Sequence, residues 1–196
     1  MRRLLILTLA ALFLVLAACA PKPYEPAGEP TGNAALDDAV LALLQERCSA
    51  KNSEQENLRA VYDFIAHDIT YRPGTADTSG GFSDELTEQL ALELLHKRKG
   101  NCDAQAALMA VLLRRMGYEA QLVQGTFVRE EGAEPVDHAW VYALVGGEGV
   151  YFDPLYGGSF AEHAEDYCMA PAALLKETHQ WDENIYQLSA AANGRL

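Results

Sequence analysis

The middle of the chain reads Gly100-Asn101-Cys102-Asp103-Ala104-Gln105-Ala106-Ala107-Leu108-Met109-Ala110-Val111-Leu112-Leu113-Arg114-Arg115-Met116-Gly117. Between Cys102 and Gly117 there is no Gly or Pro, and the large apolar residues recur at helical spacing. Gly117 suits a C-terminal cap, so Cys102 is expected at a helix N-terminus. Free backbone N–H groups and the helix dipole favour a thiolate there, which makes Cys102 a candidate nucleophile. The alternative is an inert buried cysteine, since most cysteines are structural.

Length and charge limit the classes of function. The chain has 196 residues, 49% of them hydrophobic, which favours a single globular domain with a sizeable core. Its formal net charge of −13 argues against nucleic acid as a partner, because such binding needs a clustered basic surface. The compact basic run Lys97-Arg98-Lys99 ends a predicted helix, where cations complement the helix dipole.

The N-terminus has the layout of a secretory signal: Arg2 and Arg3, an apolar run from Leu4 to Leu16, and small residues before Cys19. The apolar run is shorter than the roughly 20 residues that span a bilayer. Leu16-Ala17-Ala18-Cys19 resembles a bacterial lipobox, which implies a signal peptide over residues 1–18, cleavage before Cys19 and lipidation of its thiol. The alternative is an ordinary signal peptide and a soluble secreted protein.

Residues 19–33 contain four of the eight prolines and two glycines but almost no large apolar side chain. This composition is typical of a flexible linker, so we expect a lipidated tether over 19–33 and a folded domain over 34–196. The expected location is the extracytoplasmic cell envelope, at a membrane surface reached through the lipid anchor.

The periodicity predicts helices followed by a sheet. Helices are expected over 35–47, from Ser53 to about 68 with a Ser53/Glu56 capping box, over 83–97, from Cys102 to 116, and near Pro171. A short extended piece is expected at 69–72, and strands at 120–128, 139–145 and 150–152. Helices that precede an antiparallel sheet make an α+β fold.

The Gly146-Gly147 pair allows a geometric test of two polar residues. A two-residue turn there pairs Val145 with Glu148 and continues toward the segment that carries His138 and Asp153. Those two residues then become diagonal neighbours on one sheet face, about 7–8 Å apart between backbone positions and within reach of a side-chain hydrogen bond. A four-residue turn keeps the face but moves the pair further apart, so a contact between the two side chains favours the tight turn or a bulge that shifts the register.

Three ordered motifs carry a resemblance: Gly100-Asn101-Cys102 with its helix, His138-Ala139-Trp140-Val141, and Phe152-Asp153-Pro154. Together they resemble the core of the transglutaminase-like superfamily, which has a papain-like α+β fold. The resemblance implies a Cys102-His138-Asp153 triad that forms a thioester with a protein or cell-wall peptide. It implies transamidation, deamidation or peptide hydrolysis. The alternatives are a catalytically silent envelope module that binds a peptide in the same cleft, and a purely structural lipoprotein.

Two aromatic residues are weaker candidates for the site. Tyr71 is a candidate oxyanion donor beside the backbone N–H of Cys102, with a core aromatic as the alternative. Trp140, two residues after His138, could wall the site or belong to the core. No cofactor and no metal are expected, because the remaining histidines show no ligand spacing: His67, His96, His163 and His179.

Cys48 and Cys168 remain once Cys19 is assigned to lipid and Cys102 to chemistry. In an exported chain an even pair can form a disulfide, and this one would tie both ends of the domain together. Its loop of about 120 residues would stabilise the fold by roughly 4–5 kcal/mol. The alternative is two separate buried thiols.

Overall fold

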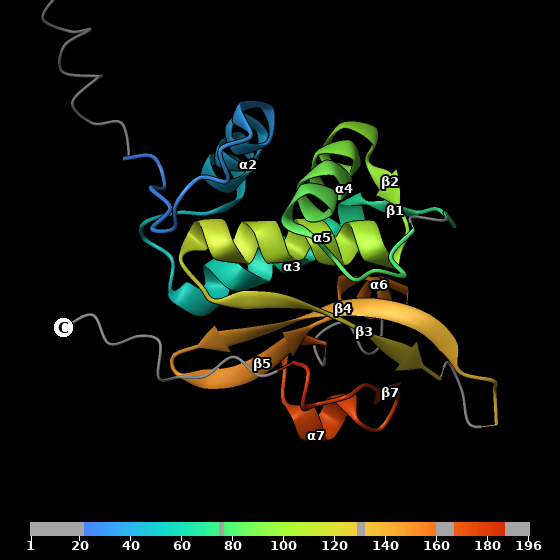
Figure 1. Ribbon diagram of the computed structural model, residues 1–196. Coiled ribbons are helices and arrows are strands. Elements are labelled where there is room, and N and C mark those ends of the chain that lie inside the picture. The colour runs from blue at the N-terminus through green and yellow to red at the C-terminus, as the bar shows by residue number, and fades with distance from the viewer. Residues whose placement is uncertain (1–21, 75–76, 129–131, 160–166, 187–196) are drawn as a thin grey trace, which may run out of the picture.

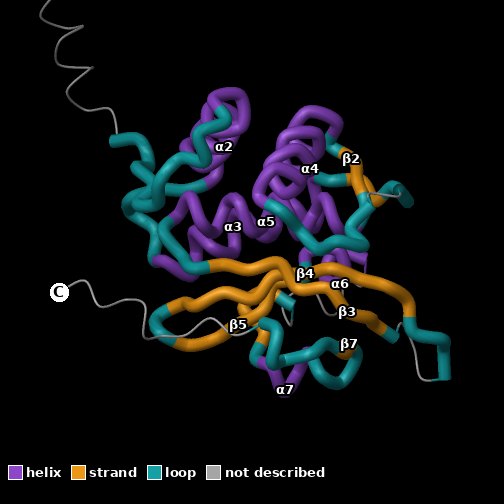
Figure 2. Tube along the Cα trace, viewed as in Figure 1, coloured by secondary structure: helices purple, strands orange, loops and turns teal. Residues whose placement is uncertain are grey.

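The computed structural model describes residues 22–74, 77–128, 132–159 and 167–186. Within them the chain forms two layers, with the longer helices packed on one face of a sheet (Figures 1 and 2). The short helix α7 (Ala172–Leu175) lies on the opposite side of the sheet (Figure 1). This arrangement confirms the predicted α+β class.

Each long helix begins directly after a polar capping residue. The helices are α2 (Ala34–Arg47), α3 (Glu54–Asp68), α4 (Asp84–Lys97) and α5 (Cys102–Met116), and their bounds lie within about a residue of those predicted. The caps are Asn33, Ser53, Ser83 and Asn101, whose side chains each accept a backbone N–H of the first turn. Each such cap stabilises its helix by about 1 kcal/mol.

One antiparallel sheet of five strands has the order β6-β5-β4-β3-β7. Its strands are β3 (Ala120–Phe127), β4 (Val136–Val145), β5 (Glu148–Phe152), β6 (Cys168–Ala170) and β7 (His179–Gln180). The sequence pattern indicated the three central strands but neither edge strand. Because β7 pairs with β3, the C-terminal segment is brought beside the middle of the domain.

The β4–β5 hairpin has the register that the tight turn predicts. Val145 pairs with Glu148, and the ladder continues to Val141 opposite Phe152. Gly146 and Gly147 both have positive φ, which a two-residue turn of type I′ requires. His138 on β4 and Asp153 after β5 are thereby placed at the same end of the hairpin.

A second, small parallel pair forms beside the N-terminus of α5. β1 (Thr70–Tyr71) pairs with β2 (Lys99–Gly100), so Tyr71 lies opposite Gly100, two residues before Cys102. The extended piece at 69–72 was predicted, but its partner was not. This pairing fixes the segment that leads into α5.

Helix α5 is the centre of the core. Every residue from Ala104 to Leu113 is buried, although the periodicity alone suggested one apolar stripe. The reason is that α5 lies between α3 and α4 on one side and β3 and β4 on the other. A helix covered on all sides needs small or apolar residues all round, and burying each leucine contributes about 1.5–3 kcal/mol.

The segment expected as a free tether is docked on the domain in its described part, residues 22–33. The Gly28 N–H donates to the Arg115 carbonyl at 3.0 Å, and the Arg115 guanidinium donates to the carbonyls of Pro26 and Gly28. Tyr24 packs against the edge of the core. Carbonyls in the last turn of a helix have no helical partner, and the Gly28 N–H satisfies that of Arg115.

The signal and lipobox residues, 1–21, lie outside the described residues. Among the helices that are described, none combines the length and apolarity of a membrane span.

The predicted Cys48–Cys168 disulfide is wrong: both residues are free, buried thiols. The Cys48 thiol points to the Asn57 carbonyl, at 3.8 Å, whereas Cys168 lies on β6 opposite Phe152. Burial raises the pKa of Cys48 to about 11 and that of Cys168 to about 12, so both thiols stay protonated at neutral pH. The two cysteines therefore act as small apolar core residues.

Candidate active site

Cys102 is the first residue of α5, as predicted, and its side chain is half-buried. The Asn101 side chain caps the helix by accepting the Ala104 N–H at 3.2 Å. The same side chain donates to Asp103 at 2.8 Å and to the Gly74 carbonyl at 3.4 Å, which links the helix start to the loop after β1. The unpaired N–H groups of the first turn remain beside the Cys102 thiol.

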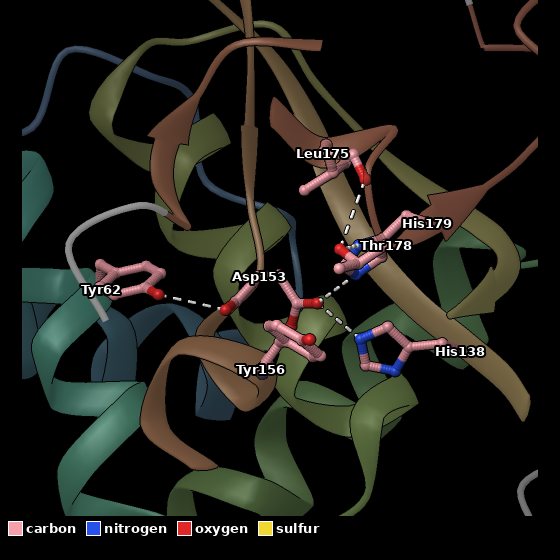
Figure 3. Close-up of polar contacts among 7 residues, drawn as sticks. All are labelled: Tyr62, His138, Asp153, Tyr156, Leu175, Thr178 and His179. Carbon is pink, nitrogen blue, oxygen red and sulfur yellow. Dashed lines mark hydrogen bonds and ion pairs between the residues drawn. The ribbon is translucent and has the colours of Figure 1, made fainter. Parts of the chain in front are cut away.

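His138 and Asp153 meet in the protein interior. His138 Nε2 lies 2.6 Å from Asp153 Oδ2, and both side chains are about 1% exposed. The hairpin geometry therefore produces the contact that the sequence predicted. Because Nε2 is engaged by the carboxylate, Nδ1 is the ring nitrogen left to face Cys102, and it points away from Asp153 in Figure 3.

The Asp153 carboxylate and backbone are held from several sides (Figure 3). Its Oδ1 accepts the backbone N–H of Tyr156 at 3.0 Å, at the start of helix α6 (Pro154–Ser159). The Tyr62 hydroxyl of α3 donates to the Asp153 carbonyl at 3.1 Å, and the Asp153 N–H donates to the Tyr167 carbonyl at 3.0 Å. Asp153 therefore has little freedom to turn away from His138.

The electrostatics of the pair favour two charges. Burial alone would lower the pKa of His138, but the Asp153 carboxylate and, secondarily, Cys102 raise it to about 10. Burial alone would raise the pKa of Asp153, but the His138 charge and the hydrogen bonds from His138 and His179 hold it far below its ordinary value. At neutral pH the structure thus favours an imidazolium beside a carboxylate, with the Cys102 thiol next to the imidazolium.

His179 is a buried polar residue that the sequence reasoning left without a role. Its Nε2 lies 2.9 Å from the same Asp153 Oδ2 that His138 contacts, and its Nδ1 lies 2.8 Å from the Thr178 hydroxyl. It reaches this position because β7 pairs Phe127 with His179. Its short strand has no hydrophobic alternation that could have marked it.

Two of the remaining histidines lie on the helical surface. His67 and His96 are exposed, in the last turns of α3 and α4. His163 lies outside the described residues.

A cleft of about 770 Å³ opens over Cys102 and His138. Asp77, Asp103 and Asp137 line it, and the described lining residues include no Lys or Arg. Burial raises the pKa of Asp103, an effect opposed by the Asn101 hydrogen bond and the His138 charge. The cleft around Cys102 and His138 is therefore acidic.

Two aromatic candidates have different positions. Tyr71 lines the cleft and is 51% exposed, so it is a rim residue and not the core aromatic that was the alternative. Trp140 is fully buried, and its ring stacks beside that of His138 at 5.8 Å between centroids. It is a core residue that also supports the imidazole. The oxyanion role of Tyr71 stays a prediction.

His138, Asp153 and His179 also place ligand-type atoms within 4.8 Å of one another, the kind of group that can hold a metal ion. The hydrogen-bond geometry explains this cluster without an ion, because both Nε2 atoms lie within hydrogen-bond distance of one carboxylate oxygen. A proton on each Nε2 satisfies the contacts and leaves these nitrogens without a lone pair for a metal.

Two solved structures are similar to part of this chain. A candidate cysteine protease from Cytophaga hutchinsonii is 21% identical, with a TM-score of 0.46 over 69% of this chain and 39% of that one. A TGase is 21% identical, with a TM-score of 0.47 over 62% of this chain and 31% of that one. The chain thus spans less than half the length of either protein. No curated protein matches the chain.

A profile described as the transglutaminase-like superfamily matches residues 42–154. This range is more than half of the chain, and it includes Cys102, His138 and Asp153. The chain therefore belongs to the transglutaminase-like superfamily.

Proposed function

We propose that this protein is an extracytoplasmic, lipid-anchored cysteine enzyme that acts on amide bonds of protein or cell-wall peptides through a thioester intermediate. One observation carries the proposal: a buried His138–Asp153 pair, 2.6 Å apart, adjoins Cys102 at a helix N-terminus in an open cleft. A buried ion pair contributes little to stability compared with apolar residues of the same size. Its presence beside a thiol is better explained by chemistry.

In the first half-reaction the Cys102 thiolate attacks the carbonyl carbon of an amide. The backbone N–H of Cys102 can donate to the developing oxyanion, and Tyr71 at the cleft rim is the candidate second donor. His138 Nδ1–H then protonates the leaving nitrogen as the C–N bond breaks. The products are an amine, a neutral His138 and an acyl group bound as a thioester to Cys102.

In the second half-reaction neutral His138 accepts a proton from an incoming amine or water. The nucleophile attacks the thioester carbonyl, the C–S bond breaks, and the thiolate–imidazolium pair returns. An amine gives transamidation, whereas water gives deamidation or peptide hydrolysis. Asp153 stabilises the imidazolium form of His138, which is present before the first half-reaction and again after the second.

The cleft charge bears on the choice of substrate. Asp77, Asp103 and Asp137 favour neutral or cationic groups over anionic ones near Cys102. A peptide carrying a primary amine therefore suits this cleft as the acyl acceptor better than a peptide rich in carboxylates.

Trapping the acyl-enzyme tests the proposal. Purified protein is incubated with amide-bearing envelope peptides, quenched in acid, digested and analysed by mass spectrometry. An acyl adduct on the Cys102 peptide, absent from Cys102→Ala and His138→Ala proteins, is the expected result. Buried Cys48 and Cys168 serve as internal controls. Peptide binding without an adduct, together with ordinary thiol reactivity at Cys102, would instead establish a catalytically silent binding module.

The anchor needs its own test. The mature protein should partition into detergent with a diacylated Cys19, and Cys19→Ser should release it or block its processing. Wild-type protein found wholly in the aqueous phase would refute lipid anchoring and leave the chemistry of Cys102 unaffected.

A further inference from the structure

One oxygen of Asp153 serves two histidines. Oδ2 lies 2.6 Å from His138 Nε2 and 2.9 Å from His179 Nε2, while Oδ1 accepts the Tyr156 N–H. A carboxylate oxygen can accept both bonds, but only if each nitrogen carries a proton. His179 lies outside the residues 42–154 that define the family match, so its position is a feature of this chain's C-terminal segment.

The Thr178 hydroxyl contacts the other ring nitrogen of His179. Its oxygen is 2.8 Å from His179 Nδ1, 3.5 Å from the Leu175 carbonyl, and also in contact with Tyr167. Because the Asp153 carboxylate can only accept, the His179 proton lies on Nε2, and Nδ1 is left to accept from the Thr178 hydroxyl.

Packing prevents His179 from moving. Its side chain is completely buried, and five rings surround it at 4.9–6.0 Å between centroids: Phe127, His138, Trp140, Tyr156 and Tyr167. The backbone is held by the β3–β7 pairing. Figure 3 shows one oxygen of Asp153 joined to both imidazoles, so a rotation of the carboxylate would break at least one of the two contacts.

We propose that His179 is a positioning residue that holds Asp153 Oδ2 toward His138 and so maintains the imidazolium beside Cys102. This inference rests on the proposed function, in which the orientation of Asp153 toward His138 serves the chemistry of Cys102. His179 touches neither the cleft nor the thiol; it acts through Asp153. It extends the Cys102-His138-Asp153 site by two residues, the buried His179 and the half-buried Thr178 that ends the chain of contacts.

The pH dependence of Cys102 reactivity also reflects the titratable groups around the two histidines. The titratable groups around the two histidines come from every packed element: Cys102 and Asp103 of α5, Asp137 of β4, Asp153, Tyr62 of α3, Tyr156 of α6 and Tyr167. None of these is altered in the variants below, so a change in profile is due to the substituted side chain.

The test measures the rate of Cys102 alkylation by iodoacetamide between pH 5 and 9, with peptide mass spectrometry to separate the three described cysteines. His179→Phe removes the donor and keeps a ring. His179→Gln can place an amide N–H near the position of Nε2 and should rescue, and His67→Gln is a control at an exposed histidine. We expect His179→Phe to lower the rate at pH 6 by about tenfold, which corresponds to a shift of one pH unit.

A second readout avoids the thiol altogether. The His138 Nε2–H proton, followed by NMR, should exchange with water faster in His179→Phe than in the wild type or in His179→Gln. Faster exchange supports the inference even if Cys102 has ordinary reactivity, an outcome that would refute the proposed function alone. Profiles and exchange rates that coincide in wild type and His179→Phe would overturn the inference and leave the proposed function intact.

A folding failure does not end the test. Circular dichroism and thermal unfolding establish whether His179→Phe is native. If it is not, Thr178→Val takes its place, because losing the hydroxyl removes the donor to His179 Nδ1. Thr178→Val should shift alkylation and exchange in the same direction by a smaller factor, and His179→Gln should not. Equal behaviour of Thr178→Val, His179→Gln and wild type would overturn the inference.

Discussion

Asp153→Asn tests the buried pair most directly, and a Cys102→Ser background removes thiol titration from the comparison. In the structure the carboxylate accepts three N–H groups, from His138, His179 and Tyr156. An asparagine amide offers one acceptor oxygen and one donor nitrogen in their place. Whichever way the amide turns, at least one buried donor faces an NH₂ group.

The expected loss of stability follows from that mismatch. Removing one partner of a buried pair costs about 3–5 kcal/mol, because the other partner stays buried without compensation. At pH 7 we therefore expect the free energy of unfolding of the Asp153→Asn double variant to be lower than that of its Cys102→Ser parent by about this amount.

The pH dependence is more diagnostic than the size of the loss. The pKa of His138 is about 10 in the folded chain, where Asp153 is the larger of the two groups that raise it above 6.5. The stabilisation that comes from this raised pKa is complete at pH values below 6.5, the pKa of His138 in the unfolded chain. It is lost as the pH rises through the folded-state pKa of about 10. The parent should lose at most about 1.4 kcal/mol per pH unit in this window. With asparagine, burial keeps His138 neutral and the slope disappears.

Urea unfolding at pH 7, 8 and 9 measures both quantities, with buried Trp140 as the fluorescence reporter. Buried Cys48 and Cys168 also titrate on unfolding, but they contribute equally to parent and variant. The decisive quantity is therefore the difference between the two slopes. Equal slopes would refute the argument that Asp153 holds His138 as an imidazolium.

Three further outcomes are expected. Gly125→Ala should lower the free energy of unfolding by about 1–3 kcal/mol, because the new Cβ would clash with a β7 carbonyl and the Trp140 ring, whereas Gly80→Ala meets open space; urea unfolding of both variants measures this. Gly28→Ala would clash with a carbonyl of α5, so residues near 28 should become accessible to limited proteolysis while the domain stays folded. Unreduced digests should contain the Cys48 and Cys168 peptides unlinked; a linked pair would contradict the structure.

Local patterns predicted most of the fold. The four helices had capping residues and apolar periodicity, and the Gly146-Gly147 turn fixed the hairpin register residue by residue. Because those signals act within a few residues, the sequence alone could place His138 and Asp153 together. The helical periodicity after Cys102 predicted its position at a helix N-terminus. The extended segment at 69–72 was also predicted, and its pairing with β2 brings Tyr71 to the cleft.

Contacts between distant segments were not predictable in the same way. The docking of residues 22–33 depends on free carbonyls at the end of α5, and composition describes only the freedom of an isolated segment. The disulfide prediction failed for a related reason. An even count of cysteines says nothing about the direction of each side chain, and the Cys48 thiol is turned toward Asn57.

His179 shows where sequence reasoning reached its limit at the site. Its strand has two residues, too few for alternation, and its partner Phe127 lies more than fifty residues earlier. One local signal did exist: Gly125 interrupts an otherwise β-rich run, and such a glycine often marks a close approach of another backbone. The structure shows that the approaching backbone is β7. A glycine in a strand indicates that another backbone packs close by. Only the folded structure shows that this backbone carries His179 to Asp153.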